Sequence, residues 1–399
     1  MSIAACYDDF VEMFGVVEKA AHEKGVEGAT ERKLRQMTLA EVGGLLGLQQ
    51  AGVIRAMRDA GISHRARLDF TEVLQLRTAL AGEGGDTRYV PRRREALGER
   101  LATVVFANYK GGSGKTTASI HFAQYMARRG HRVLMVDLDS QASATNQFGV
   151  DYGSGGDDEG RGFLSWTQAR DARILVSAAS LCVRTHWPTI DLVPAGPFLF
   201  EAEDALAARA RSGKLEEVAY FDELGAFLEE VAPAYDVVVV DVRPDVNFLM
   251  STALHAASRV VIPMKPMAVD LSSTRAFFQH LSGYVRQYEA AFDRPFGSAG
   301  ARLLVTQYTP TDRSQATMVA LMRELLGDLL YPGEFLNSPV VGTASFRHET
   351  LYEYESTTDR TAYSRVIGSV NAVCGAIEED VSSFWGRPPQ GGNKTGRAP

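Results

Sequence analysis

Eight consecutive residues, Lys110-Gly-Gly-Ser-Gly-Lys-Thr-Thr117, hold the side chains that phosphate binding requires. The glycines lack Cβ atoms, so their backbone N–H groups can approach phosphate oxygens closely, and a lysine can neutralise phosphate charge. The apolar run Thr103–Ala107 precedes this stretch, and a helical pattern over Ala118–Arg128 follows it. A strand, a glycine-rich turn and a helix in this order predict a P-loop, in which the helix start adds a positive partial charge.

Individual residues of this loop have expected tasks. We expect Lys115 to reach the β and γ phosphates of a nucleotide and the hydroxyl of Thr116 to ligate Mg²⁺, with Thr117 near the α-phosphate. The full set of nucleotide-binding residues that we expect is Lys110, Gly111, Gly112, Ser113, Gly114, Lys115, Thr116, Thr117 and Gln307.

The loop departs from the standard pattern at its mouth. In G-x-x-x-x-G-K-[ST] the first glycine would fall on Tyr109, but here a second lysine, Lys110, follows one residue later. The standard loop has no task for a lysine in front of its glycines, so Lys110 requires a separate explanation.

Aspartates end two apolar runs and supply the acidic side chains that such a site needs. The run Asp236–Asp241 has the Walker B form, in which the last aspartate holds Mg²⁺ directly or through water. The segment Val136–Gln141 carries Asp137 and Asp139 at the same edge of the predicted sheet. We expect Asp241 and Asp137 to lie at the metal and Asp139 to orient the attacking water.

Six short runs rich in β-branched residues alternate with helical segments after residue 100. Because these runs are apolar throughout, they predict a mostly parallel sheet buried on both faces, and hence a doubly wound α/β domain. Ligands in that architecture bind beyond the carboxyl ends of the strands, where the P-loop and the aspartates lie. The predicted strands are Thr103–Ala107, Arg132–Asp137, Ile190–Pro194, Asp236–Asp241, Arg259–Pro263 and Arg302–Thr306.

The composition is that of an ordinary soluble globular protein and argues against several classes of function. Of 399 residues, 45% are hydrophobic, and no apolar run approaches the roughly 18 residues of a membrane-spanning helix. The first residues lack the basic and apolar regions of a secretory signal. Three distant cysteines and eight histidines without ligand spacing argue against a zinc or iron–sulfur site and suit a reducing cytoplasm.

The N-terminal part of the chain predicts a helix-turn-helix. Thr38 and Glu41 form a capping box, in which each side chain satisfies a free backbone N–H at the helix start. Gly47 allows a tight turn, and a second helix follows from about Gln49. The residues of this second helix that we expect to face inward are Val53, Ile54 and Met57.

The outward face of the second helix would read DNA, because the second helix of this arrangement lies in the major groove. Residues 31–100 carry 13 basic and 9 acidic side chains, a charge of +4 that the overall charge of −7 conceals. Short helix pairs also occur in proteins that never touch DNA, but Arg65, Arg67 and Arg77 favour the DNA-binding interpretation. The expected contacts are Gln49, Gln50, Arg55 and Arg58.

These patterns divide the chain into five segments. Residues 1–30 contain an amphipathic helix, either a packed core helix or a dimerisation element, and residues 31–81 form the helix-turn-helix domain. Residues 82–100, rich in Gly, Pro and charge, form a basic linker whose run Arg92–Arg94 is solvated or contacts phosphates. Residues 101–385 form the α/β domain, and residues 386–399 lack an apolar face and are expected to be disordered.

The stretch Lys110–Thr117 resembles the deviant Walker A motif of the ParA/MinD ATPases, whose extra lysine is their signature. The resemblance implies a task for Lys110, which would reach across a dimer interface to the phosphates of the partner's ATP. The site would therefore be completed in trans. ATP and Mg²⁺ are the implied ligands, and the implied reaction is hydrolysis of ATP to ADP and phosphate.

A narrower resemblance extends over roughly residues 30–385. The P-loop, the segment Val136–Thr145 and the preceding helix-turn-helix are similar to those of the large plasmid-partition ParA proteins. Within that class they most resemble the RepA group of alphaproteobacterial replication and partition operons. The segments Glu41–Gly47, Leu74–Arg77 and Met267–Ser273 also fit this group.

The resemblance implies that an ATP-bound homodimer binds duplex DNA without sequence preference, with Arg313 and Arg347 as the best-matching basic residues. A centromere-binding partner of the ParB class would stimulate slow hydrolysis and release the DNA. The N-terminal domain would bind its own operator and repress its operon. The implied location is the cytoplasm, on the nucleoid and not on a membrane, because the Pro- and Gly-rich tail lacks the basic amphipathic helix of a MinD-like membrane cycle.

Two departures from the family pattern leave an alternative open. Ser140 replaces the usual proline after the catalytic aspartate, and Arg243 replaces the first proline of the pair after Walker B. Both lie in segments expected to change between nucleotide states. The alternative is a nucleotide-gated transcriptional repressor with negligible ATP turnover.

Overall fold

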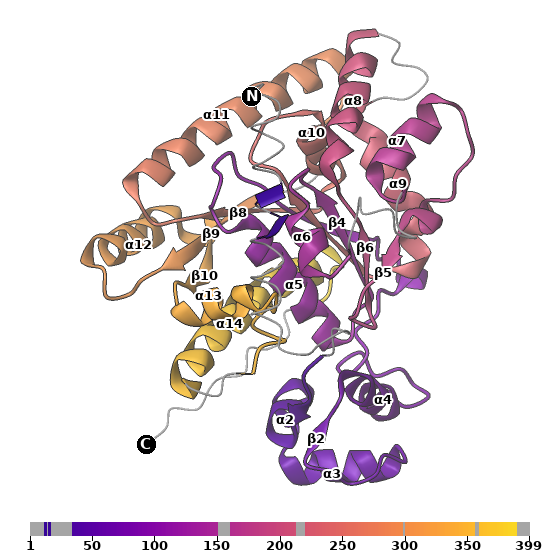
Figure 1. Ribbon diagram of the computed structural model, residues 1–399, viewed down its shortest axis with the longest axis vertical. Coiled ribbons are helices and arrows are strands. Elements are labelled where there is room, and N and C mark those ends of the chain that lie inside the picture. The colour runs from indigo at the N-terminus through magenta and orange to yellow at the C-terminus, as the bar shows by residue number, and fades with distance from the viewer. Residues whose placement is uncertain are drawn as a thin grey trace.

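The computed structural model describes residues 12, 13, 15, 16, 34–150, 160–212, 220–297, 300–355 and 359–388. The amphipathic helix expected within residues 1–30 lies outside the described residues apart from four positions, and so does the tail from residue 389. Figure 1 shows a large α/β body with a smaller group of helices, formed by the N-terminal part of the chain, at one end.

An eight-stranded sheet forms the centre of the body, in the order β10-β9-β8-β3-β7-β4-β6-β5. Neighbouring strands are parallel except at one edge, where β5 runs antiparallel to β6. The strands are β3 (Ala102–Phe106), β4 (Val133–Leu138), β5 (Val183–Arg184), β6 (Ile190–Val193), β7 (Val237–Val242), β8 (Arg259–Met264), β9 (Gly300–Tyr308) and β10 (Leu330–Leu336). The six predicted strands agree with β3, β4, β6, β7, β8 and β9 to within two residues at each end.

Helices cover both faces of this sheet (Figure 1). They are α5 (Lys115–Arg129), α6 (Ser143–Gln147), α7 (Phe163–Asp171), α8 (Phe200–Ser212), α9 (Glu223–Val231), α10 (Phe248–Ala256), α11 (Ala268–Phe292), α12 (Arg313–Leu326), α13 (Pro339–Phe346) and α14 (Arg360–Phe384). Along β3, Val104 and Phe106 join the core formed with α5 and α14, whereas Val105 joins the core formed with α9 and α10. This two-sided burial confirms the doubly wound α/β fold.

None of the helices in the described segments combines the length and the apolar composition that crossing a membrane requires.

The N-terminal group consists of a short ribbon and three helices: β1 (Met37–Thr38), β2 (Arg67–Leu68), α2 (Leu39–Leu46), α3 (Gln50–Asp59) and α4 (Phe70–Ala81). The predicted capping box is present, because Thr38 Oγ1 accepts from the Glu41 N–H and the Glu41 carboxylate accepts from the Thr38 N–H. Gly47 ends α2 with φ +66°, which confirms the tight turn. A Cβ on Gly43 would lie 2.5 Å from the Leu48 carbonyl oxygen, so the turn also depends on a glycine within α2.

Three arginines on which the predicted DNA-binding face partly depends make contacts within this chain. Arg77 is buried in α4, where its guanidinium donates to two backbone carbonyl groups. Arg65 and Arg67 each pair with a glutamate at 2.8 Å. The expectation that these arginines contribute to a DNA-binding face is therefore wrong for Arg77, and the other two are already paired.

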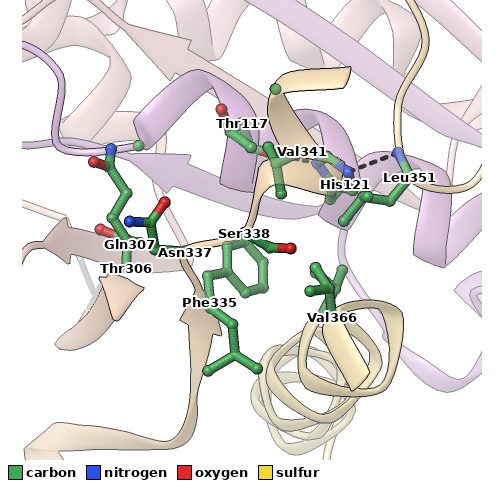
Figure 2. Close-up of a pocket in the computed structure, with 14 residues that line it drawn as sticks. Thr117, His121, Thr306, Gln307, Phe335, Asn337, Ser338, Val341, Leu351 and Val366 are labelled. Carbon is green, nitrogen blue, oxygen red and sulfur yellow. Dashed lines mark hydrogen bonds between the residues drawn. The ribbon is translucent and has the colours of Figure 1, made fainter. Parts of the chain in front are cut away.

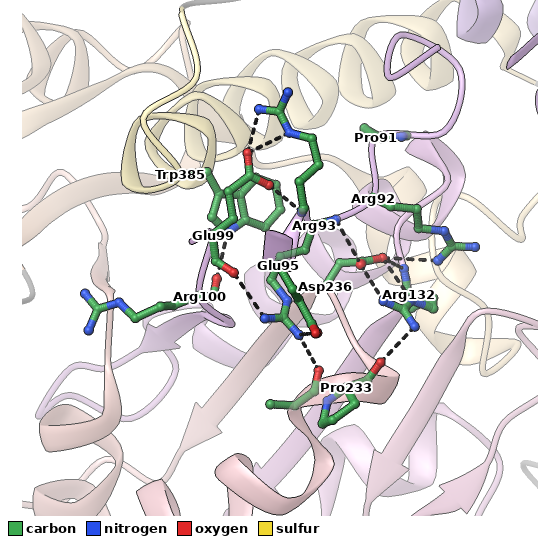
Figure 3. A network of polar contacts seen from close by, with 12 residues as sticks. Pro91, Arg92, Arg93, Glu95, Glu99, Arg100, Arg132, Pro233, Asp236 and Trp385 are labelled. Atoms are coloured by element: carbon green, nitrogen blue, oxygen red, sulfur yellow. Dashed lines mark hydrogen bonds and ion pairs between the residues drawn. The ribbon is translucent and has the colours of Figure 1, made fainter. Parts of the chain in front are cut away.

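The arginine run expected in a solvated linker is bound to the α/β body (Figure 3). Arg92 and Arg132 both pair with the buried carboxylate of Asp236, at N–O distances of 3.1 and 2.8 Å. The guanidinium of Arg93 donates to the carbonyl oxygen of Ala232, the residue that directly follows α9, at 2.6 Å. The linker is thus fixed to the body by its own arginines. The expectation of a solvated run is wrong for Arg93, whose side chain is 6% exposed, whereas Arg92 and Arg94 are paired but keep 39% and 40% of their side chains exposed.

Glu99 ties the same linker to the end of the chain. Its buried carboxylate pairs with Arg94 at 2.6 Å and with Arg387 at 2.7 Å. Burial by itself would raise the pKa of Glu99. The hydrogen bonds from Arg387 and Arg94 outweigh this effect and lower the pKa to about 2. Arg387 lies in the segment 386–399 that was expected to be disordered, so this expectation is wrong for the first residues of the tail.

Replacing Glu99 by glutamine is expected to lower the free energy of unfolding by about 2–4 kcal/mol, because two guanidinium groups lose a buried carboxylate. Urea unfolding followed by circular dichroism measures this loss. Since the pKa of Glu99 is lowered, its contribution is full above the ordinary value of 4.5 and disappears as the pH falls toward 2. Arg88→Ala is the control, because the exposed Arg88–Asp86 pair should leave stability unchanged. Equal unfolding midpoints for Glu99→Gln and wild type at pH 7 would contradict this role.

Candidate nucleotide-binding site

The P-loop joins β3 to α5 at the carboxyl edge of the sheet. Gly112 and Gly114 have φ angles of +68° and +85°, a region that favours glycine. A Cβ on Gly114 would also lie 3.3 Å from the Cβ of Thr306. The backbone path therefore requires glycine at these positions, as expected for a loop whose N–H groups face phosphates.

Two residues of β9 support the loop. Thr306 Oγ1 donates to the Ser113 carbonyl oxygen at 2.6 Å, and Gln307 Nε2 donates to the Gly112 carbonyl oxygen at 2.9 Å. Gln307 has a φ of +51°, which is uncommon for a residue with a side chain. Gln307, expected to bind nucleotide, thus lies beside the P-loop and holds it. No sequence pattern points to Thr306, which is 193 residues from its partner Ser113.

Lys115 is buried inside the loop, with 6% of its surface exposed. Its ammonium group donates to the Lys110 carbonyl oxygen at 3.2 Å. Burial lowers the pKa of Lys115, and the charges of Asp241 and Asp139 oppose that effect. The ammonium group is therefore held between the loop backbone and the acidic residues, where the terminal phosphates of a nucleotide would lie.

Lys110 is held by a carboxylate of its own chain. Its Nζ lies 2.7 Å from Asp270 Oδ2 in the first turn of α11, and the Asp270 side chain is 2% exposed. Asn108 fixes the loop entrance, since its Oδ1 accepts from the Lys110 N–H at 3.2 Å and its Nδ2 donates to a β8 carbonyl oxygen at 2.7 Å. No sequence pattern assigns a role to Asn108 or Asp270, although Asp270 lies within Met267–Ser273, a segment that carries the family resemblance.

Asp137 and Asp241 lie side by side on the neighbouring parallel strands β4 and β7. Burial raises the pKa of Asp137 to about 6, while its oxygens accept from the Asp139 N–H and from the N–H and hydroxyl of Thr145. Burial and the neighbouring Asp137 raise the pKa of Asp241 well above its ordinary value. Among the described residues, neither carboxylate oxygen of Asp241 has a hydrogen-bond partner.

An unpartnered buried carboxylate near a threonine hydroxyl fits a Mg²⁺ ion, which takes one or two carboxylates together with waters and phosphate oxygens. Asp241 and Thr116 would hold the ion, since the Thr116 hydroxyl lies near enough to Asp241 to oppose part of the rise in its pKa. Asp137 was also expected at the metal. In the structure its oxygens hold the backbone that follows β4, so Asp241 is the carboxylate best placed to take the ion directly.

Asp139 is half-buried just after β4, and its Oδ1 accepts from the Gln141 N–H at 3.0 Å. Its charge opposes, together with that of Asp241, the lowering of the Lys115 pKa by burial, so the carboxylate faces that ammonium group. Asp139 is therefore brought to the same edge as Lys115 and Asp241, as its expected role in orienting water requires.

Two pockets flank the start of α5. One of about 260 Å³ opens next to the P-loop and is shown in Figure 2. Its polar residues near the loop include Thr117, Gln307 and Asn337, and its depth is lined by apolar residues such as Phe335 and Val366. This pocket could hold the base and sugar of a nucleotide whose phosphates lie on the loop. The other, of about 290 Å³, lies between α5, α6 and α13.

The residues expected to contact DNA lie on the surface. In α3, Val53 and Met57 are buried and Ile54 is half-buried. The expected DNA contacts are all exposed: Arg55 and Arg58 along α3, and Gln49 and Gln50 where the helix begins. Arg313 begins α12 and Arg347 follows α13, and both side chains are exposed.

Known proteins are similar in sequence to this chain over the P-loop domain and over most of its length. Residues 101–291 match the model of a family described as AAA domain. A protein named replication protein A from Sinorhizobium fredii (strain NBRC 101917 / NGR234) is 34% identical over 375 residues, which cover 90% of this chain and 88% of that protein. Protein SopA of Escherichia coli (strain K12) is 25% identical over 358 residues, which cover 86% of this chain and 87% of SopA.

A solved structure also shares the fold over nearly the whole chain. The structure named Partition Protein aligns with a TM-score of 0.64 at 16% identity and covers 97% of this chain and 100% of its own. The likeness in structure shows the fold, and the 34% identity over most of both chains shows the family. With its lysine-bearing P-loop, the chain belongs to the ParA/MinD-type family of ATPases and is most like the large ParA proteins of plasmid partition.

Proposed function

We propose that this chain is a partition ATPase, which binds Mg²⁺ and ATP, dimerises, hydrolyses ATP slowly and so moves on and off DNA. One observation carries the proposal. A second lysine, Lys110, stands at the mouth of a P-loop that also faces the unpartnered buried carboxylate of Asp241. The loop backbone and Lys115 would suffice to bind a nucleotide, whereas Lys110 and Asp241 suit a shared reaction that depends on a metal ion.

The proposed reaction assigns a task to each group. The loop N–H groups and Lys115 would hold the β and γ phosphates, and Thr116 and Asp241 would hold Mg²⁺, whose charge would offset that of the phosphate oxygens. Asp139 orients a water for attack on the γ-phosphate. Asp137 keeps Asp139 in place through the hydrogen bond that it accepts from the Asp139 N–H at 3.1 Å. Positive charge that is already in position stabilises the charge of the transition state.

The surface around Lys110 supports the proposed homodimer. Asp270, the partner of Lys110, lies among exposed apolar residues at the start of α11, and Pro244 lies 3.9 Å from where a Cβ of Gly111 would be. Exposed apolar groups that gather at one place mark interaction surfaces. A second copy of the chain would cover them and bring Lys110 to the partner's nucleotide. The exposed apolar side chains at this mouth are Tyr109, Val246, Met267, Val269 and Leu271.

The proposed cycle takes place in the cytoplasm, on the nucleoid. Arg313 and Arg347 would contact DNA phosphates in the ATP-bound dimer, and a ParB-class partner would stimulate hydrolysis and release. Fluorescence anisotropy of a labelled duplex of arbitrary sequence tests this cycle, with ATP, with ADP and without nucleotide. Binding that requires ATP and weakens steeply with salt is expected, since phosphate contacts release counterions. Equal binding in all three nucleotide conditions would contradict the proposed cycle.

We also propose that α3 binds the operator of the protein's own operon. The double variant Arg55→Ala and Arg58→Ala is expected to weaken protection of the promoter in footprinting by at least about 10-fold, because each lost arginine contact costs about 1–3 kcal/mol. Nonspecific binding with ATP should persist in this variant. Arg313→Ala is the matched control. It should leave the promoter footprint unchanged and weaken nonspecific binding with ATP. An unchanged footprint in the double variant removes the operator assignment.

A further inference from the structure

Residues 350–354 form a buried turn between α13 and α14, and this turn contacts both the helix of the P-loop and the N-terminal group. At its centre the carboxylate of Glu353, a residue 8% exposed, accepts from the Thr350 N–H at 2.8 Å. Buried charge-assisted hydrogen bonds hold the turn in one position. Three further side chains contact the same carboxylate, namely Gln124 at 3.2 Å, His186 at 2.7 Å and Trp187 at 2.7 Å.

On one side the turn is bonded to α5 through His121. The Nδ1 atom lies 2.7 Å from the Thr117 carbonyl oxygen, and Nε2 accepts from the Leu351 N–H at 3.2 Å (Figure 2). Because Nε2 accepts, Nδ1 carries the hydrogen and donates to Thr117. Burial lowers the pKa of His121, which keeps the ring neutral and suits this tautomer. His121 therefore joins the last residue of the P-loop motif to the turn.

On the other side the turn is bonded to the N-terminal group through Arg35. The Leu351 carbonyl oxygen accepts from the Tyr363 hydroxyl at 2.9 Å. The Arg35 guanidinium donates to the Tyr352 carbonyl oxygen at 3.1 Å and to the Tyr363 hydroxyl at 3.5 Å. Arg35 also pairs at 2.7 Å with Glu41, which completes the capping box of α2. Continuous polar contacts thus run from the P-loop to the start of α2 in the N-terminal group.

A second contact runs beside this path. The guanidinium of Arg128, near the end of α5, lies 4.5 Å from the centre of the Tyr352 ring and 4.0 Å from the sulfur of Met37 in β1. Arg128 is buried, so α5, the turn and the ribbon of the N-terminal group pack against one another without intervening solvent.

From these contacts we propose that the turn 350–354 transmits nucleotide binding at the start of α5 to the N-terminal helices, through His121, Tyr363 and Arg35. The inference rests on the proposed binding of nucleotide at the P-loop. A phosphate held next to Thr117 changes the position of a carbonyl group that is bonded to His121. The following links are part-buried and bonded, so protein rather than solvent takes up the shift. Such coupling is reciprocal. If nucleotide binding shifts the conformational equilibrium of the N-terminal group, that equilibrium must change nucleotide affinity by the same factor.

Hydrogen exchange of the full chain, with and without saturating Mg²⁺ and ATP, tests the inference. In wild type, nucleotide is expected to change exchange of the amides in α2 and α3 by about 5-fold or more. Tyr363→Phe removes the hydroxyl that joins Leu351 to Arg35 while keeping the ring, and should abolish this response. ATP affinity measured by calorimetry should remain within about 10-fold of wild type. Glu41→Gln is a second variant with the same expected loss.

Tyr354→Phe is the matched control, because it removes a hydroxyl from the same turn but outside the path, and its response should equal that of wild type. A full response in both Tyr363→Phe and Glu41→Gln would overturn the path. No response of α2 and α3 in wild type at saturating ATP would overturn the coupling while the proposed ATPase stands. No ATP binding by wild type in calorimetry would overturn the proposed function, and this inference with it.

Discussion

Lys115→Ala is expected to weaken ATP binding by about 100- to 1,000-fold and to reduce ATP turnover below detection. Lys115 is the cation buried among the loop backbone, Asp241 and Asp139. Removing a preorganised charge or donor from a water-excluded site costs about 3–4 kcal/mol, and each 1.4 kcal/mol corresponds to a factor of ten in affinity. Without Lys115 the phosphates would face two carboxylates with no protein ammonium group between them.

Calorimetric titration with ATP and Mg²⁺ measures this effect, and a steady-state phosphate assay gives the turnover. The thermal unfolding transition of the apo variant shows whether the fold is kept. Lys115→Arg is an informative companion, because it keeps the charge but replaces a compact ammonium by a planar fork. Retention of wild-type ATP affinity in Lys115→Ala would mean that the nucleotide does not bind at this loop.

Lys110→Ala is expected to separate binding from reaction. We expect ATP affinity to change by less than about 10-fold, while ATP-dependent dimerisation is lost and turnover falls by about 100-fold or more. Lys110 is 32% exposed at the mouth of the loop, and its ammonium group is bonded to Asp270 rather than directed into its own site. Reaching a partner's phosphates would require this pair at 2.7 Å to open or rearrange.

Analytical ultracentrifugation with ATP and with ADP measures the dimer, and calorimetry measures ATP affinity in the same samples. Asp270→Asn is the matched variant, since it weakens the hold on Lys110 while leaving the lysine in place. It should dimerise with ATP at least as readily as wild type. An ATP-dependent dimer of undiminished stability in Lys110→Ala would contradict a site completed in trans.

The parallel sheet could be predicted because its strands are buried on both faces and therefore read as continuous β-branched runs. β10 could not, because Leu330–Leu336 contains Pro332 and Gly333, which are typical of edge strands and turns. β5 has two residues and carries no periodic signal. The strands around the site were the most regular part of the sequence, so the fold that positions the P-loop was predictable.

Within the site, the residues that follow one another in the chain were predictable, and the residues that support them from elsewhere were not. The sequence stretch 110–117 carries its own pattern, but Asp270 contacts Lys110 across 160 residues and Thr306 contacts Ser113 across 193. Nothing in local spacing identifies such partners. The family resemblance covered Asp270 without assigning it a task.

Residue type alone was a poor guide to the basic surface. Arg77 and the run Arg92–Arg94 read as exposed cations in the sequence. In the fold, Arg77 is buried and bonded to backbone carbonyl groups, while Arg92 pairs with a buried carboxylate. Arg55 and Arg58 could be placed correctly because the apolar period of α3 identified the opposite face of the helix as exposed.

We propose that this protein turns over ATP in a cycle linked to DNA. The measurement to make is steady-state phosphate release by the wild-type chain with Mg²⁺ and ATP, in the presence and absence of duplex DNA of arbitrary sequence. We predict slow turnover that rises several-fold with DNA and disappears when EDTA removes Mg²⁺. ATP binding without turnover in any of these conditions would contradict the proposed ATPase cycle and favour a repressor that uses nucleotide only as a ligand.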